Sequence, residues 1–190
     1  PQPQPLPLPL SMPKIAFFIN PTIRHFKKIE IDIQHHFLNQ DYQFFISEYS
    51  GHFLTLPKRA VEEGFTHFIA VGGDGTLNEI VNGLIEAFRT ENGYDWERIS
   101  QIKIGILPSG SGNDFIKNLG YQNIEELQSL IAKDSSALVD VGFAEFLNRE
   151  KQKAERFFIN VSDVGIGGEV VISKERLPLV FPGDVNYFIA

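Results

Sequence analysis

The sequence predicts an α/β fold built on a Rossmann-like parallel sheet with helices on both faces. Short apolar segments rich in β-forming residues alternate along the chain with longer segments whose apolar residues recur at helical spacing. Two of the short segments run directly into glycine-rich turns, at 72–76 and 109–114. Alternation of this kind is typical of parallel strands joined by covering helices.

The expected elements follow one another from residue 14 onward. The strands are expected over residues 14–19, 43–48, 67–71, 102–107 and 137–143. The helices are expected over residues 24–38, 54–63, 76–89 and 123–132, with a shorter one near 113–119. In the helix over 76–89 the apolar residues at helical spacing are Leu77, Ile80, Val81, Leu84, Ile85 and Phe88.

Trp96, His35 and His36 have ordinary structural explanations. Trp96 lies in a polar insertion, residues 90–100, where we expect it to anchor local packing rather than to stack on a ligand. His35 and His36 are adjacent on a helix, so their side chains point in different directions. With no partner at the spacing of a metal site, both are expected on the solvated surface.

The composition bounds the classes of function. A chain of 190 residues suits one domain with some residues left over, and 43% hydrophobic residues with 17 Phe are enough for a core. The absence of Cys excludes a disulfide framework, a thiolate nucleophile and a Cys-ligated metal, and fits a cytoplasmic location. The net charge of −7 argues against nucleic acid as a partner and gives no overall attraction to anionic membranes.

Residues 1–11 are a proline-rich leader in which Pro alternates with Gln or Leu. Such a segment is expected to be disordered, with polyproline II character, and to lie outside the core. It lacks the charged start and apolar stretch of a signal peptide. It is either sequence added ahead of a natural start at Met12 or a proline-rich ligand for a partner protein.

The most informative segment is Gly72-Gly73-Asp74-Gly75-Thr76, which joins an apolar strand to an amphipathic helix. Glycines let the backbone approach phosphate oxygens, and the N-terminus of a helix adds free N–H donors and a favourable dipole. Asp74 would repel a bare phosphate, so it indicates a divalent cation between carboxylate and phosphate. A structural alternative covers part of the pattern, because Thr76 and Glu79 have the spacing of a helix capping box.

A second glycine-rich turn, Ser109-Gly110-Ser111-Gly112-Asn113-Asp114, follows the strand expected over 102–107. Ser111 and Asp114 could cap the short helix after it, and alone the turn could simply be flexible. Two such turns after neighbouring parallel strands would face one crevice. Neither turn is a Walker A motif or a G-x-G-x-x-G dinucleotide fingerprint, so they indicate another class of nucleotide site.

These residues resemble the diacylglycerol kinase catalytic-domain family, in its bacterial lipid kinase branch, which is related to the sphingosine kinases. The resemblance rests on Ile19-Asn20-Pro21, Gly72-Gly73-Asp74-Gly75-Thr76-Leu77-Asn78-Glu79 and Gly105-Ile106-Leu107-Pro108 with Gly110-Ser111-Gly112-Asn113-Asp114-Phe115. Looser matches are Val139-Asp140-Val141-Gly142, 157–161 and Gly165-Ile166-Gly167. The GGDGT element is shared with NAD kinases, and the element over 105–115 favours lipid kinases.

The resemblance implies ATP and Mg²⁺ as cofactors and a lipid as the phosphoryl acceptor. The nucleotide site would comprise Asn20, Ser47, Gly72, Gly73, Asp74, Gly75, Thr76, Asn78, Glu79, Gly110, Ser111, Gly112 and Asn113. Asp74 would be the catalytic residue and the Mg²⁺ ligand. Ser47 and Ser111 stand where the family commonly has Thr, which keeps the hydroxyl. This chain departs from the family at 22–25, where a Gly is usual, and at His52, where an acidic residue is common.

The resemblance also implies the domain organisation. Residues 12–146 would be the nucleotide-binding α/β kinase domain, and residues 147–190 the beginning of an incomplete, β-rich second domain. The general base would lie beyond Ala190, since no position here matches its motif. The protein is expected to be cytoplasmic and to touch the membrane surface transiently. Whether it forms a homodimer is left open. Two alternatives remain: a kinase of a soluble substrate such as NAD, and a non-catalytic nucleotide-binding module.

Overall fold

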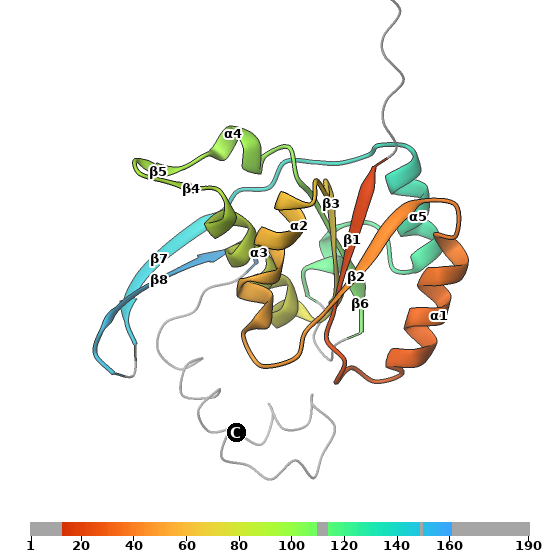
Figure 1. The fold of residues 1–190 in the computed structure, drawn as a ribbon, viewed down its shortest axis with the longest axis horizontal. Helices are drawn as coiled ribbons and strands as arrows, with labels where there is room; N and C mark the ends of the chain where they lie inside the picture. The colour runs from red at the N-terminus through yellow and green to blue at the C-terminus, as the bar shows by residue number, and fades with distance from the viewer. Residues whose placement is uncertain (1–12, 110–113, 149, 161–190) are drawn as a thin grey trace, which may run out of the picture.

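The computed structural model describes residues 13–109, 114–148 and 150–160 (Figure 1). Its centre is a four-stranded parallel sheet in the order β2-β1-β3-β6. The strands are β1 (Lys14–Ile19), β2 (Asp41–Ile46), β3 (His67–Gly72) and β6 (Lys103–Pro108). Because all four are parallel, their carboxyl ends lie along one edge of the sheet.

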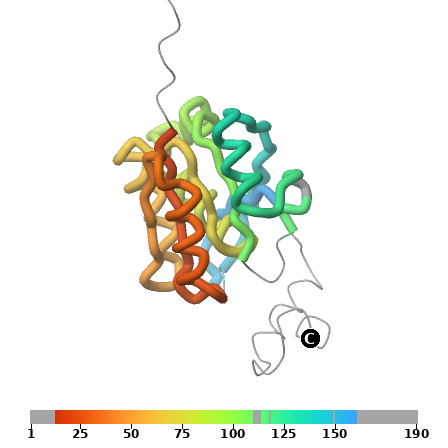
Figure 2. The backbone as a smooth tube through the Cα atoms, turned by 90° about the vertical axis from the view of Figure 1, so that its right-hand side faces the viewer, coloured from red at the N-terminus to blue at the C-terminus, as the bar shows by residue number. Residues whose placement is uncertain are grey.

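Helices cover both faces of this sheet, as the sequence predicts. The first face carries α1 (Phe26–His36) and α5 (Ile124–Ala132), which pack on each other and lie side by side in Figure 2. The opposite face carries η1 (His52–Leu54), α2 (Leu56–Glu62) and α3 (Asp74–Ala87) (Figure 1). A short turn of 3-10 helix, η2 (Ile116–Asn118), precedes α5.

Aromatic side chains on the two central strands form the core. Phe17 and Phe18 are fully buried and point to opposite faces of the sheet, as successive residues of a strand must. Phe17 packs edge-on against Phe37, with ring centroids 5.0 Å apart. Phe18 lies 5.0 Å from Phe68 and 5.2 Å from Phe45. The unbroken apolar runs of β1 and β3 are therefore explained by burial on both sides.

The fifth expected strand, over 137–143, is not part of the parallel sheet. Residues 137–141 form no strand, and β7 (Gly142–Leu147) pairs antiparallel with β8 (Lys153–Phe158) in a separate sheet. The hairpin packs on α3, and β7 runs across position 146, where the sequence predicts a domain boundary. β8 ends at Phe158, so only the start of the segment 157–161, a looser match to the family, is strand, and residue 161 lies outside the described part.

The polar insertion contains structure that composition did not indicate. It holds a small hairpin of β4 (Arg89–Thr90) and β5 (Gly93–Tyr94), then α4 (Trp96–Ile99). Trp96 is a packing residue, as expected, although its side chain is half exposed. Its ring lies 5.9 Å from that of Phe157 and 5.8 Å from that of Tyr94. The insertion therefore rests on the β7–β8 hairpin.

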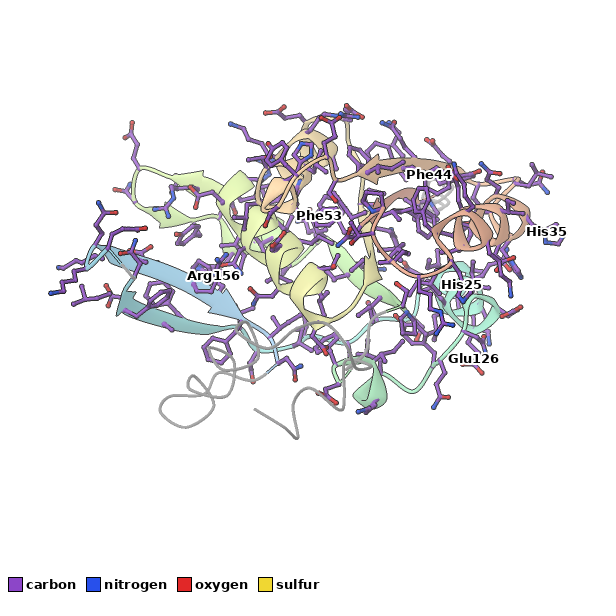
Figure 3. The ribbon with its side chains drawn as sticks, turned by 90° about the horizontal axis from the view of Figure 1, so that it is seen from below. His25, His35, Phe44, Phe53, Glu126 and Arg156 are labelled. Atoms are coloured by element: carbon purple, nitrogen blue, oxygen red, sulfur yellow. The ribbon has the colours of Figure 1, made fainter. Side chains whose placement is uncertain are left out.

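The two adjacent histidines of α1 have different environments. His35 is exposed and projects away from the molecule (Figure 3), as the sequence predicts. His36 is only partly exposed, so its assignment to the solvated surface is wrong. Its Nδ1 lies 2.8 Å from the carbonyl oxygen of Asp32, and its Nε2 lies 3.3 Å from Glu125 Oε1. His36 thus links α1 to α5.

Candidate functional site

The carboxyl edge of the sheet brings together residues that are far apart in the sequence. Asn20, Ser47, Gly73 and Ser109 each follow the last residue of one strand. The chain runs from β1 outward to β2 and then crosses to β3 on the other side of β1. A parallel sheet places its ligand crevice at such a reversal. The crevice predicted by topology therefore lies between the ends of β1 and β3, at Asn20 and Gly73.

The first glycine turn is shorter than the sequence suggests, because α3 already begins at Asp74. Gly73 is the N-cap residue, and no side chain caps the helix. The capping box, the structural alternative for Thr76 and Glu79, is therefore not formed: Thr76 lies inside the first turn, too late to act as the N-cap. The backbone N–H groups at the start of α3 remain directed at the crevice, as in helix termini that bind anions.

Gly72 is required by the close approach of β3 and α3. A Cβ atom built on Gly72 would lie 2.4 Å from the Oγ1 atom of Thr76. By contrast, a Cβ atom on Gly75 would meet nothing within 4 Å. Part of the glycine pattern thus serves the fold, while Gly75 has no steric reason among the described residues to be a glycine.

Asp74 joins the first turn to the segment that follows the second. Its Oδ2 accepts a hydrogen bond from the backbone N–H of Asp114, and its Oδ1 accepts one from Phe115, both at 3.0 Å. The side-chain amide of Asn160 lies 3.4 Å from Oδ1. The carboxylate is half-buried rather than a free loop group, and an ionised carboxylate has about four acceptor positions. Counted over the described residues, these bonds leave one position for a further partner.

The predicted nucleotide residues Gly110, Ser111, Gly112 and Asn113 lie outside the described residues, as does the predicted cap by Ser111. The residues on both sides of this segment are placed. The backbone N–H of Ser109 donates to the carbonyl oxygen of Gly72 at 3.1 Å, and Asp114 is held by Asp74. The two ends of the second turn therefore lie beside the first turn.

Asn20 and Ser47 line the same edge on the β1 and β2 side. The Oδ1 atom of Asn20 accepts from the backbone N–H of Thr22 at 3.0 Å and from its hydroxyl at 2.7 Å. This turn leads the chain away from the sheet after β1. Ser47 is buried, with 9% of its surface exposed, and its N–H donates to the carbonyl oxygen of Ile19 at 3.1 Å.

His52, which stands where an acidic residue is common in the family, organises the loop after Ser47. Its Nδ1 accepts a hydrogen bond from the backbone N–H of Glu48 at 3.1 Å. Its ring stacks on Tyr49, with centroids 4.3 Å apart. The departure at this position thus has a local structural explanation.

Asn78 and Asn82 hold the β7–β8 hairpin against α3. Their Nδ2 atoms lie 3.0 and 2.9 Å from the carbonyl oxygen of Phe157, and Asn82 Oδ1 accepts from the Phe157 N–H at 2.9 Å. The sequence assigns Asn78 to the nucleotide site, a prediction that this contact does not test, and it gives no role to Asn82. The signal was available, because residues four apart share one face of a helix. Glu79, also predicted in the site, is partly buried on α3.

The described residues include no cluster of three or more His, Asp or Glu side chains arranged to hold a metal ion. In the same portion of the chain, no helix combines the length and apolarity needed to cross a membrane.

Comparison with known proteins gives a consistent assignment. Residues 14–144 match the model of the diacylglycerol kinase catalytic domain. A diacylglycerol kinase of Staphylococcus carnosus is 32% identical over 133 residues, which are 70% of this chain and 37% of that protein. One from Staphylococcus aureus strain JH9 is 32% identical over 132 residues, which are 69% of this chain and 35% of that protein.

The fold gives the same result. The crystal structure of a diacylglycerol kinase from Bacillus anthracis is 27% identical, with a TM-score of 0.52, over 74% of this chain and 47% of that one. The present chain thus spans about a third to a half of the length of these relatives. Since the matching segment covers most of the described residues and carries both glycine turns, the chain belongs to the diacylglycerol kinase catalytic-domain family.

Proposed function

We propose that this chain carries the nucleotide-binding half of an ATP-dependent lipid kinase. Such an enzyme transfers the γ-phosphoryl group of ATP to a lipid hydroxyl. The observation that carries the proposal is the uncapped start of α3 at Gly73 and Asp74, at the reversal point of the sheet, with the second glycine turn tied beside it. Family membership supports the kinase reaction, and the geometry supports the place of its phosphates.

The start of α3 supplies the positive end of this site. Backbone N–H groups there have no intrahelical acceptor, and the helix dipole favours negative charge. Phosphoryl transfer needs positioning and stabilisation of charge more than covalent chemistry from the protein. Gly73 lets the phosphates approach the backbone, while Asn20 and Ser47 line the neighbouring strand ends.

The residues present fit a magnesium ion. Mg²⁺ is commonly bound through one or two carboxylates together with substrate phosphates. Asp74 offers one carboxylate, and its bonds to Asp114, Phe115 and Asn160 leave one acceptor position among the residues that the structure describes. When bound there, the ion would offset the charge of the phosphate oxygens. Asp74 therefore has two tasks, to hold the second turn and to hold the cation.

The acceptor side of the reaction belongs to the remainder of the whole protein. We propose that residues 147–190 begin a β-rich domain that carries the lipid site and the general base. A protein of this kind would act from the cytoplasm at the membrane surface. Two alternatives are phosphorylation of a soluble acceptor such as NAD and nucleotide binding without transfer. The products that the full-length protein forms from labelled ATP distinguish both from lipid phosphorylation.

The binding site is tested by isothermal titration of the chain with Mg·ATP. We expect Gly73→Val to abolish measurable ATP binding, because the added side chain blocks the approach of phosphate to the start of α3. The matched control is Thr90→Val, an exposed position on β4. Unchanged ATP affinity in a folded Gly73→Val variant would show that the nucleotide binds elsewhere.

A further inference from the structure

A second candidate site lies beside β6. A cavity of about 510 Å³ opens between β6, α3, α4, α5 and the segment after α5. Most of its lining is apolar and includes Ile69, Leu84, Trp96, Ile104 and Leu127. This volume is in the range of cavities that hold small ligands. No residue of the first glycine turn lines it, so this is a separate place in the molecule.

One end of the cavity is polar. His67, the first residue of β3, is 7% exposed and lines the cavity. Its Nδ1 lies 3.0 Å from the hydroxyl of Thr66, but its Nε2 has no hydrogen-bond partner in the described part of the chain. Buried polar atoms are nearly always hydrogen-bonded. His67 Nε2 therefore indicates a group that the cavity receives from elsewhere.

The charges near His67 already compensate each other. Lys103 of β6 and Asp134 after α5 both line the cavity and form an ion pair. A charged group of a ligand at this end would find no free countercharge among these residues. Its burial would therefore carry an uncompensated desolvation cost. The head of the ligand is therefore expected to be uncharged and able to form hydrogen bonds.

The open side of β6 adds a second polar feature. The N–H groups of Lys103 and Ser109 donate to carbonyl oxygens at the two ends of β3, so the even-numbered residues between them direct their peptide groups away from the sheet. At Ile106 these groups meet the hydroxyl of Tyr121, at 2.8 and 2.9 Å. The peptide groups of Ile104 face the side of β6 on which the cavity lies, and they are nearer to His67 than those of Ile106.

We propose that this cavity binds a single-chain amphiphile with an uncharged head, such as a monoacylglycerol. The acyl chain would lie among the side chains of β6, α3 and α5, and a hydroxyl of the head would meet His67 Nε2. His67 is five strand positions from Gly72, roughly 17 Å. A head group bound there is too far from the phosphates to be the acceptor, so this would be an additional site beyond the proposed kinase reaction.

The chain contains its own probe of this site. Trp96 is the one tryptophan in the sequence, and it lines the cavity. Monodecanoylglycerol, titrated below its micelle concentration, should produce a saturable change in Trp96 fluorescence with one site per chain. The Gly73→Val variant should respond in the same way, which separates this site from nucleotide binding.

His67→Leu should weaken monodecanoylglycerol binding roughly fivefold, the value of one neutral hydrogen bond. His35→Leu makes the same replacement at an exposed histidine of α1 and should leave the affinity unchanged. Decane, which lacks the hydroxyl, should bind the original chain and His67→Leu equally well. If monodecanoylglycerol bound the original chain and His67→Leu with equal affinity, the placement of its head at His67 would be overturned.

A cavity-filling variant keeps the proposal testable if His67→Leu does not fold. Ile104→Phe should abolish the fluorescence change while the chain keeps its circular dichroism spectrum. Absence of any saturable change in the original chain would overturn the proposal. Strong protection of the Ile104 amide from hydrogen exchange without ligand would do the same, since it would mean that residues 137–141 already occupy this side of β6.

Discussion

At the scale of single residues, Asp74 shows how a loop carboxylate can serve structure and chemistry together. Its two oxygens meet two consecutive backbone N–H groups that lie 40 and 41 residues further along the chain. Charge-assisted hydrogen bonds of this kind are stronger than neutral ones. The residue that motif reasoning assigns to a cation is therefore also the residue that positions the second glycine turn.

Replacement of Asp74 by Asn should reduce both stability and turnover. The amide of Asn has one acceptor oxygen, so one of the N–H groups of Asp114 and Phe115 would face an NH₂ group instead. We expect a loss of about 1–3 kcal/mol in the free energy of unfolding, measured by urea denaturation of the chain. Turnover in the full-length protein should fall more steeply than stability explains. Asp41→Asn, at an exposed position, is the control.

His67 should make stability depend on pH. Burial lowers the pKa of His67 from its ordinary value of 6.5, and the nearby Lys103 lowers it further, while Asp134 acts in the opposite direction. Between the folded and unfolded pKa values the unfolded chain binds more protons, so stability rises with pH in that window. The melting temperature should therefore fall as the pH drops below about 6.5.

The same measurement on His67→Leu identifies the source of this pH dependence. The variant has no imidazole to protonate at this position, so its melting temperature should change less between pH 7.5 and pH 5. His35→Leu should retain the full dependence. An identical pH profile in the original chain and in His67→Leu would show that another group is responsible.

At the scale of elements, α3 contains two glycines with opposite reasons to exist. A Cβ atom on Gly83 would lie 2.6 Å from the carbonyl oxygen of Phe53 and 2.8 Å from that of Leu54. Both are backbone atoms of η1, which cannot move aside as the end of a flexible side chain can. A Cβ atom on Gly75 of the same helix would meet no described residue within 4 Å. Gly83 thus permits α3 to approach η1, and Gly75 does not have that role.

Alanine should destabilise the protein at Gly83 but not at Gly75. Gly83→Ala should cost about 2 kcal/mol, because the clash with η1 outweighs the better helix propensity of Ala. Gly75→Ala should be neutral or stabilise by about 0.5 kcal/mol, since only the propensity changes. Paired urea denaturation curves test both. Equal effects would mean that the contact between α3 and η1 does not limit their approach.

At the scale of the whole molecule, the parallel sheet and its two helical layers could be predicted because strands buried on both sides read as unbroken apolar runs. The carboxyl edge with Asn20, Ser47 and Gly73 could be predicted for the same reason. The bonds from Asp74 to Asp114 and from Asn82 to Phe157 could not, because they join distant parts of the chain without a local pattern. The strand over 137–143 was misplaced because apolar alternation does not specify a pairing partner.

The proposed division of labour predicts an incomplete reaction in the isolated chain. The 190 residues should bind Mg·ATP but phosphorylate dioleoylglycerol far more slowly than a protein of the relatives' full length does. Transfer of labelled phosphate to lipid in mixed micelles, compared at equal concentrations of bound ATP, measures this difference. Robust lipid phosphorylation by the isolated chain would place the acceptor site and the general base within these residues.

The hydroxyl of Tyr121 also determines which peptide groups of β6 are open to another strand. In the described sheet β6 is an edge strand, and the exposed peptide groups of such a strand are a template for another chain. Tyr121 occupies both peptide groups of Ile106 near the middle of that edge. An incoming strand would have to displace this side chain before it could pair along β6. One buried phenol thus blocks strand pairing at Ile106 on this edge.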